Sequence, residues 1–226
     1  MRVHIRGQMG VQILQSFVAL SRLHDDEEPI IVVNTAGLHY DATEKLTQVF
    51  DVKCEIRHQD EMRKTPYWEP GAAEAVYHTR ERTLSKWLQP KKHEFSGLLL
   101  QVMHCRGGDK SVASAEAYKV LADRVGLKID LVVSNDRTLG ESVASQIGAE
   151  FNPESTPIED WVTLLNANAV VAAPSAFVAS TLVLDPNKRI HFAGESLCDG
   201  PYSATAGDLL FIDEMSRYCK SVGVVG

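Results

Sequence analysis

The chain has 226 residues, of which 44% are hydrophobic and 23% are charged, and its formal net charge is −7. This balance is typical of a globular protein with one large domain or two smaller domains. The acidic charge argues against a nucleic-acid-binding protein, which would normally carry a basic stripe. No apolar run is long enough to span a membrane, and the N-terminus lacks the apolar segment of a signal peptide. We therefore expect a cytoplasmic protein without a membrane span.

The cysteines and histidines show no metal-binding pattern. The four cysteines, Cys54, Cys105, Cys198 and Cys219, are far apart and form no CxxC pair. They therefore suggest neither a zinc site nor a disulfide framework, as expected in a reducing compartment. The histidines show no spacing such as HExxH. We expect no bound metal.

The first part of the chain alternates between strand and helix patterns. We expect strands over residues 2–6, 30–34 and 52–56. The run 30–34 is continuously apolar, as in a buried parallel strand. A helix follows the first strand, with Ile13, Leu14, Phe17 and Leu20 on one face, and further helices are expected over residues 42–50 and 72–88. Residues 90–93 read as a linker, so we place an N-terminal domain at residues 1–92.

The second part continues the alternation more regularly. Strands are expected over residues 97–103, 129–133, 149–151, 169–173 and 189–192, with helices between them. Such repetition predicts an α/β fold with parallel sheets and right-handed crossovers. We place a second domain at residues 93–205. A last helix within residues 206–226, with Phe211, Met215, Tyr218 and Val222 on one face and no strand after it, is expected to pack back on the first domain.

Ligands of open α/β sheets bind at the carboxyl ends of the strands, and two such ends carry glycine-rich loops. After the first strand, Gly7, Gly10 and Gln12 lie in a loop that either faces a phosphate or sugar or simply makes a tight turn. After the strand 97–103, Arg106 precedes Gly107 and Gly108, and a guanidinium beside backbone amides can bind a diphosphate.

The residues around these loops have ordinary structural interpretations as well. Asp109 can cap the next helix, and His104 can be a hydrogen-bonded core residue. Ser134 and Asp136 can bind a base or ribose, or form a turn and a helix cap. Ser175 can cap a helix or bind an anion, whereas Phe177 fits a core position better.

The order of these segments resembles that of the α-1,2- and α-1,6-fucosyltransferase superfamily, and most closely its α-1,2 branch. Residues 104–109, His-Cys-Arg-Gly-Gly-Asp, resemble its His-x-Arg-Arg-Gly-Asp motif, with Gly107 in place of the second arginine. Residues 6–15 are similar to its glycine-rich opening motif, although Val11 stands where that motif has an asparagine. Residues 134–136 stand where the family has Ser-Asp-Asp, and residues 173–180 resemble its Ser-Asn-Ser-Ser/Thr-Phe-Ser segment. The resemblance covers residues 2–20 and about 97–184.

The resemblance implies a GT-B fold, in which two Rossmann-like domains face each other across a cleft. It implies an inverting, metal-independent glycosyltransferase that transfers a sugar, fucose by resemblance, from a GDP-sugar to a carbohydrate acceptor, with no other cofactor. Arg106 and Asp109 would form the catalytic set. The donor would contact residues from both domains: Gly7, Gly10, Gln12, His104, Gly107, Gly108, Ser134, Asp136, Ser175 and Phe177. His39 and Asp41 are candidates for the base by position only.

Two other functions are alternatives to a glycosyltransferase. A catalytically silent nucleotide- or sugar-binding module on the same fold is favoured by Gly107 in place of an arginine. A Rossmann oxidoreductase is disfavoured, because the chain lacks GxGxxG and has Asn34 where a ribose-binding acid would follow the second strand.

Overall fold

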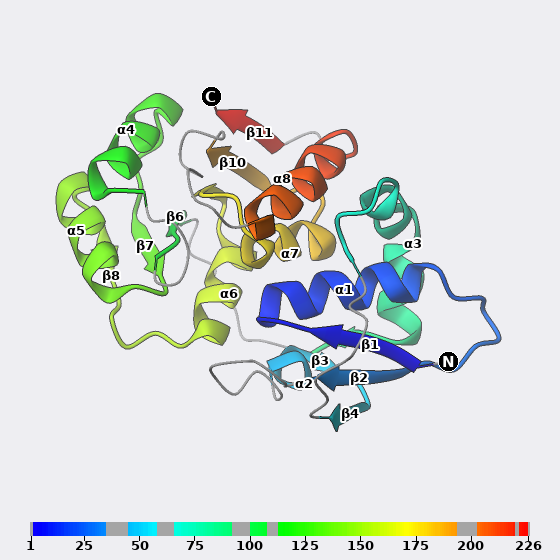
Figure 1. Ribbon diagram of the computed structural model, residues 1–226. Coiled ribbons are helices and arrows are strands. Elements are labelled where there is room, and N and C mark those ends of the chain that lie inside the picture. The colour runs from blue at the N-terminus through cyan, green and yellow to red at the C-terminus, as the bar shows by residue number, and fades with distance from the viewer. Residues whose placement is uncertain are drawn as a thin grey trace.

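Parallel sheets with helices packed on them make up the computed structural model of this chain (Figure 1). The structure describes residues 2–34, 45–57, 66–91, 100–107, 113–193, 203–219 and 222–225. The α/β class with parallel sheets predicted from the sequence is confirmed. The finer assignment to two Rossmann-like domains with boundaries near residues 92 and 205 stays a prediction.

The first half of the chain forms a three-stranded parallel sheet in the order β1-β2-β4. Its elements are β1 (Arg2–Arg6), α1 (Met9–Ser21), β2 (Ile30–Asn34), α2 (Lys45–Val49), β4 (Cys54–Arg57) and α3 (Ala72–Lys86). A short antiparallel pair joins β3 (Phe50–Asp51) to β5 (Gln89–Pro90). The predicted helix 42–50 therefore ends at Val49, and Pro90 of the predicted linker belongs to a strand.

The second half forms a six-stranded sheet in the order β11-β10-β9-β6-β7-β8, in which every pair is parallel. Its strands are β6 (Gln101–Cys105), β7 (Leu131–Ser134), β8 (Glu150–Phe151), β9 (Ala169–Ala172), β10 (Arg189–Ala193) and β11 (Val222–Val225). Its helices are α4 (Ala115–Val125), α5 (Arg137–Ile147), α6 (Pro157–Asn166), α7 (Ala176–Leu184) and α8 (Ser203–Ser216).

Three of these bounds correct the sequence analysis. β6 ends at Cys105, two residues beyond the predicted end, so His104 lies within the strand and Arg106 directly after it. The sequence predicts a helix over residues 142–147 between the strands 129–133 and 149–151, but α5 begins five residues earlier, at Arg137, because Asp136 caps it. The expectations that Val222 belongs to the last helix and that no strand follows this helix are wrong, because α8 ends at Ser216 and β11, which begins at Val222, pairs with β10. Its three valines have the β-branched side chains that strands favour.

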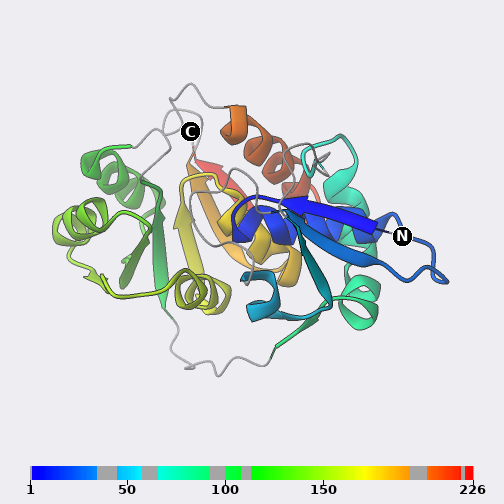
Figure 2. The ribbon, with the colours of Figure 1, turned by 60° about the horizontal axis from the view of Figure 1, so that its bottom comes forward.

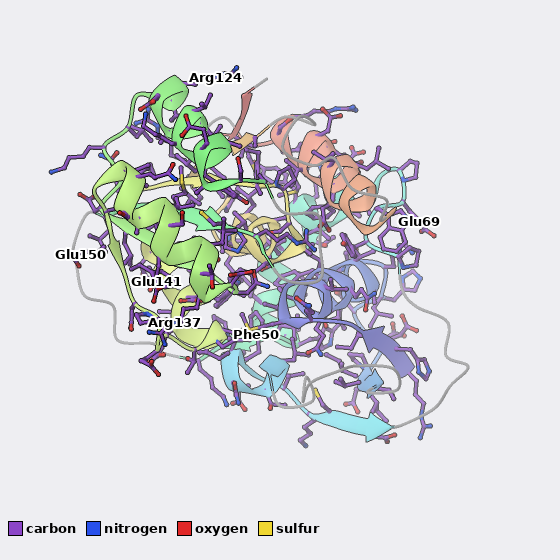
Figure 3. All side chains as sticks on the ribbon, turned by 60° about the vertical axis from the view of Figure 1, so that its left-hand side comes forward. Phe50, Glu69, Arg124, Arg137, Glu141 and Glu150 are labelled. Atoms are coloured by element: carbon purple, nitrogen blue, oxygen red, sulfur yellow. The ribbon has the colours of Figure 1, made fainter. Side chains whose placement is uncertain are left out.

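Side chains that alternate along the strands divide the core of the second sheet between its two faces. Met103 and Val171 face a cluster with α4 and α5. Val102 and Val170 face a larger cluster, which also holds residues of α6 and α7. Figure 3 shows α4 and α5 along the outer side of the molecule, with Arg137 and Glu141 on α5. The opposite face of the sheet therefore looks toward the first half.

Helix α1 connects the two halves. Every residue of α1 except Val11 is buried, which is expected of a helix with protein on all sides. It contacts β1, α3 and α7, so it lies between the first sheet and the second half (Figures 1 and 2). Phe50 packs edge-to-face on Phe17 of α1 at 6.2 Å and on Trp161 of α6 at 6.5 Å. One continuous hydrophobic cluster thus includes residues of both halves.

Helix α8 contacts both α3 and α7. The carboxylate of Glu214 on α8 accepts hydrogen bonds from the backbone N–H groups of Gly71, at 2.8 Å, and Ala73, at 3.3 Å. These amides lie at the N-terminus of α3, where a negative charge is stabilising. The last helix is therefore anchored on the first half of the chain, while β11 after it joins the sheet of the second half.

Candidate functional site

Arg106 lies directly beyond the carboxyl end of β6, the position at which α/β proteins bind ligands. Its backbone N–H donates to the hydroxyl of Tyr118 on α4 at 2.9 Å. Its guanidinium Nη1 donates to Oδ2 of Asp208 at 3.1 Å and to the carbonyl of Pro174 at 3.2 Å. The side chain is 20% exposed, so it is held by protein contacts and still reaches the surface.

Asp208, on α8, is the carboxylate of this ion pair and is 2% exposed. Its Oδ1 accepts a hydrogen bond from the hydroxyl of Tyr67. Burial raises the pKa of Asp208, and the contacts with Tyr67 and Arg106 act in the opposite direction. The pKa of Tyr67 is also raised, first by burial and then by the charge of Asp208. The sequence analysis did not identify either residue.

His104 lies on the face of β6 that looks toward α7. Its ring stacks on that of Phe177, with centroids 5.6 Å apart and an interplanar angle of 29°. Its Nδ1 is buried and has no hydrogen-bond partner among the residues that the structure describes. Burial, helped by the charge of Arg106, lowers the pKa of His104 to about 3, so the imidazole is neutral at physiological pH. The structure brings together Phe177 and His104, which the sequence analysis assigned to the donor.

The glycine loop after β1 reaches the same place from the first half of the chain. Gly7 has a positive φ of 116°, and Gln12 donates from Nε2 to the Gly7 carbonyl at 2.9 Å. A Cβ built on Gly10 would lie 2.4 Å from the backbone N and Cα of Phe177. The absence of a side chain at Gly10 thus lets the N-terminus of α1 touch the N-terminus of α7.

The strand ends of β6 and β7 are joined by an amide clamp. The Gly107 N–H donates to Oδ1 of Asn135 at 2.9 Å, and Nδ2 of Asn135 donates back to the Gly107 carbonyl at 3.1 Å. A Cβ on Gly107 would lie 2.3 Å from the Cβ of Asp136, so only glycine fits there. The clamp fixes the backbone directly after Arg106.

Three other residues that were predicted to bind the nucleotide-sugar donor make turn or helix-cap contacts in the structure. Asp136 accepts from the Leu139 N–H at 3.0 Å and so caps α5. The hydroxyl of Ser134 accepts from the Asp136 N–H at 3.1 Å. Ser175 accepts from the Val178 N–H at 3.2 Å and caps α7. These contacts are the turn and cap interactions that the sequence analysis gave as alternatives.

Four predicted site residues, Gly108, Asp109, His39 and Asp41, lie outside the described residues. Within the described part of the chain, no group of histidines, cysteines and carboxylates could hold a metal ion. None of the helices searched there is long and apolar enough to cross a membrane.

Taken together, these contacts place one guanidinium, one neutral imidazole and the N-termini of two helices in one region of the molecule. Arg106 bonds to Pro174, next to the first turn of α7, and His104 stacks on Phe177 in that turn. Helix N-termini and guanidinium groups both favour anions, and a neutral imidazole can accept or donate a hydrogen bond. The arrangement is compatible with the binding of an anionic, polar ligand, and the carboxylate of Asp208 already contacts both Arg106 and the first backbone amide of α7, that of Ala176.

Compared with known protein families, curated proteins and solved structures, the chain has no match.

Proposed function

We propose that this protein is a glycosyltransferase that uses a nucleotide-diphosphate sugar, with Arg106 binding the diphosphate. The observation that carries the proposal is the position of Arg106. It follows a parallel strand directly, is partly exposed, and is fixed beside the N-terminus of α7. The resemblance to the fucosyltransferase superfamily makes GDP-fucose the proposed donor and a carbohydrate hydroxyl the proposed acceptor.

In the proposed reaction, the acceptor oxygen forms a bond to the anomeric carbon of the sugar while the bond from that carbon to the diphosphate breaks. The hydroxyl proton passes to a base, and negative charge accumulates on the leaving GDP. A guanidinium that is already oriented stabilises this charge most in the transition state. In this proposal, Arg106 and the helix amides would take the place of a metal ion, in line with the inverting, metal-independent mechanism that the resemblance implies.

Residues of both halves would contribute to donor binding. The buried, neutral His104 would help to position the nucleotide through its stacking on Phe177, and the loop with Gly7, Gly10 and Gln12 would approach from the first half. The contact of Gly10 with Phe177 supports this assignment, because it brings the loop and the His104 ring to the same helix terminus.

Calorimetric titration with GDP tests the proposal. Arg106→Ala should weaken GDP binding by on the order of 100-fold, by analogy with the loss of an oxyanion-stabilising donor. Arg137→Ala is the matched control, because Arg137 is an exposed arginine on α5 that pairs with Glu141. Equal affinity of the wild type and Arg106→Ala would refute the role of Arg106.

The second candidate is a nucleotide- or sugar-binding module without catalytic activity. The ion pair between Arg106 and Asp208 favours it, because Asp208 neutralises the charge that a departing diphosphate needs. Gly107 in place of a second arginine acts in the same direction. A transfer and hydrolysis assay with labelled GDP-fucose separates the two, since the module would bind the nucleotide and release no product.

A further inference from the structure

Asp208 and Tyr67 form a buried pair that the proposed reaction does not use. They are 2% and 3% exposed, respectively. They come from different halves of the chain, since Asp208 lies on α8 and Tyr67 precedes α3 in the first half. A buried carboxylate is costly unless its oxygens are hydrogen-bonded. Here one oxygen accepts from Tyr67 and the other from Arg106, and the carboxylate also accepts from the backbone N–H of Ala176, so these hydrogen bonds offset the cost of burial.

This geometry determines which part of Arg106 a ligand could reach. Nη1 is shared between Asp208 and the carbonyl of Pro174. Two acceptors on one nitrogen restrict rotation of the planar guanidinium. A fifth of the side chain is exposed, at 20%, so Arg106 is not wholly enclosed by these contacts. A ligand anion would approach Nε and Nη2, on the edge of the guanidinium away from Nη1.

We propose that Asp208 and Tyr67 are positioning residues of the anion site, which act through Arg106. Asp208 holds the Nη1 corner of the guanidinium, and Tyr67 holds Asp208, so that Nε and Nη2 are presented to the ligand. The inference rests on the proposed function in taking a nucleotide diphosphate as that ligand. It adds that the first half of the chain and α8 both control the affinity of an arginine in the second half.

The same carboxylate could instead act as an internal competitor that occupies the place of the ligand. The two roles predict opposite effects when the Tyr67 hydroxyl is removed. A positioning residue loses its orientation, so anion binding weakens. A competitor loses its anchor, so anion binding tightens. Tyr67→Phe distinguishes them because it deletes one hydrogen bond and leaves the charges of Asp208 and Arg106 in place.

The experiment titrates GDP and, separately, inorganic pyrophosphate into the wild type and Tyr67→Phe. We expect affinity for either ligand to fall about three- to tenfold, the effect of one buried hydrogen bond. Tyr77→Phe is the matched control, since Tyr77 stacks on Tyr218 at 5.2 Å and makes no contact with Arg106. In an Arg106→Ala background, Tyr67→Phe should have no further effect on affinity. Unchanged or tighter binding by Tyr67→Phe would overturn the inference.

A second readout needs no ligand and separates this inference from the proposed function. Phenylglyoxal modifies arginine, and peptide mass spectrometry gives the rate at each site. Arg106 should react several-fold faster in Tyr67→Phe and Asp208→Asn than in the wild type. Arg137, whose side chain is 64% exposed, serves as the internal reference. If the wild type binds neither GDP nor pyrophosphate, the proposed function fails, and the rate at Arg106 alone decides whether Tyr67 and Asp208 hold the guanidinium. An unchanged rate refutes that role.

Discussion

Replacing Gly10 by alanine tests directly whether the close contact between α1 and α7 joins the two halves of the protein. In Gly10→Ala, the new Cβ would lie 2.4 Å from two backbone atoms of Phe177 and 2.5 Å from the carbonyl carbon of Ala176. Carbon atoms in good contact are about 3.5–4.0 Å apart, so α1 and α7 must separate by roughly an ångström. Because the opposing atoms are backbone, no side-chain rotation can relieve the contact.

The magnitude follows from two opposing effects. Overpacking of a core costs about 1–3 kcal/mol, and a contact against backbone lies at the upper end. Alanine offsets part of this, since its helix propensity exceeds that of glycine by up to about 1 kcal/mol. We expect a net loss of about 2 kcal/mol. For a chain of this size, that loss corresponds to a fall in Tm of roughly 4–8 °C.

Thermal unfolding followed by circular dichroism, together with urea titration, measures the effect. Gly140→Ala is the matched control, because a Cβ there lies 2.4 Å from the ring of Phe151, which can rotate away. That variant should lose distinctly less stability. The close packing of α1 on α7 is not the contact that joins the halves if the Tm of Gly10→Ala equals that of the wild type. The same conclusion follows if its Tm is no lower than that of Gly140→Ala.

Two further predictions concern buried titratable groups. His104 has a pKa of about 3 when folded and an ordinary pKa near 6.5 when unfolded, so the unfolded state takes up the proton first as the pH falls. Stability should therefore fall by about 1.4 kcal/mol per pH unit below about 6.5, and level off below about 3. His104→Gln, compared with the wild type by urea titration between pH 6.5 and 4.5, should lack this contribution, and parallel profiles would contradict it. Lys188 is 5% exposed, and its Nζ donates to the carbonyls of Leu165 and, at 2.8 Å, Ala167 at the end of α6. Lys188→Met should cost about 1–3 kcal/mol because those carbonyls lose a buried donor, whereas Lys119→Met, at an exposed pair with Asp123, should leave Tm unchanged.

The parts of the fold that the sequence predicts well are those with a strong local pattern. β2, β7 and β9 are short runs of apolar, mostly β-branched residues, and such runs are typical of buried parallel strands. The start of α5 depends on the cap at Asp136, which a search for apolar periodicity misses. β11 is only four residues long, and although its valines favour a strand, the sequence analysis assigned so short a run to the end of the preceding helix.

In the candidate site, too, the sequence predicts what depends on neighbouring residues and does not predict contacts between distant segments. The position of Arg106 after a strand could be predicted, because the strand and the residue are adjacent in sequence. Its partner Asp208 could not, because 102 residues separate Asp208 from Arg106, and 141 residues separate Asp208 from Tyr67. Neither partner stands in a motif, and a lone aspartate within a helix gives no signal of burial. Only the packing of α8 against both halves brings the three side chains together.

This packing also couples the stability of the protein to the geometry of Arg106. The guanidinium is held by Asp208 of α8, the aspartate by Tyr67 of the first half, and α8 itself by the N-terminus of α3. A change that shifts the first half relative to the second therefore alters the orientation of Arg106 without touching it. Conversely, an anion that binds Arg106 only in the folded state stabilises that arrangement by mass action. Tyr67→Phe weakens both the hold on Arg106 and the packing of α8 on the first half. Pyrophosphate should therefore raise the Tm of this variant by less than it raises the Tm of Tyr77→Phe.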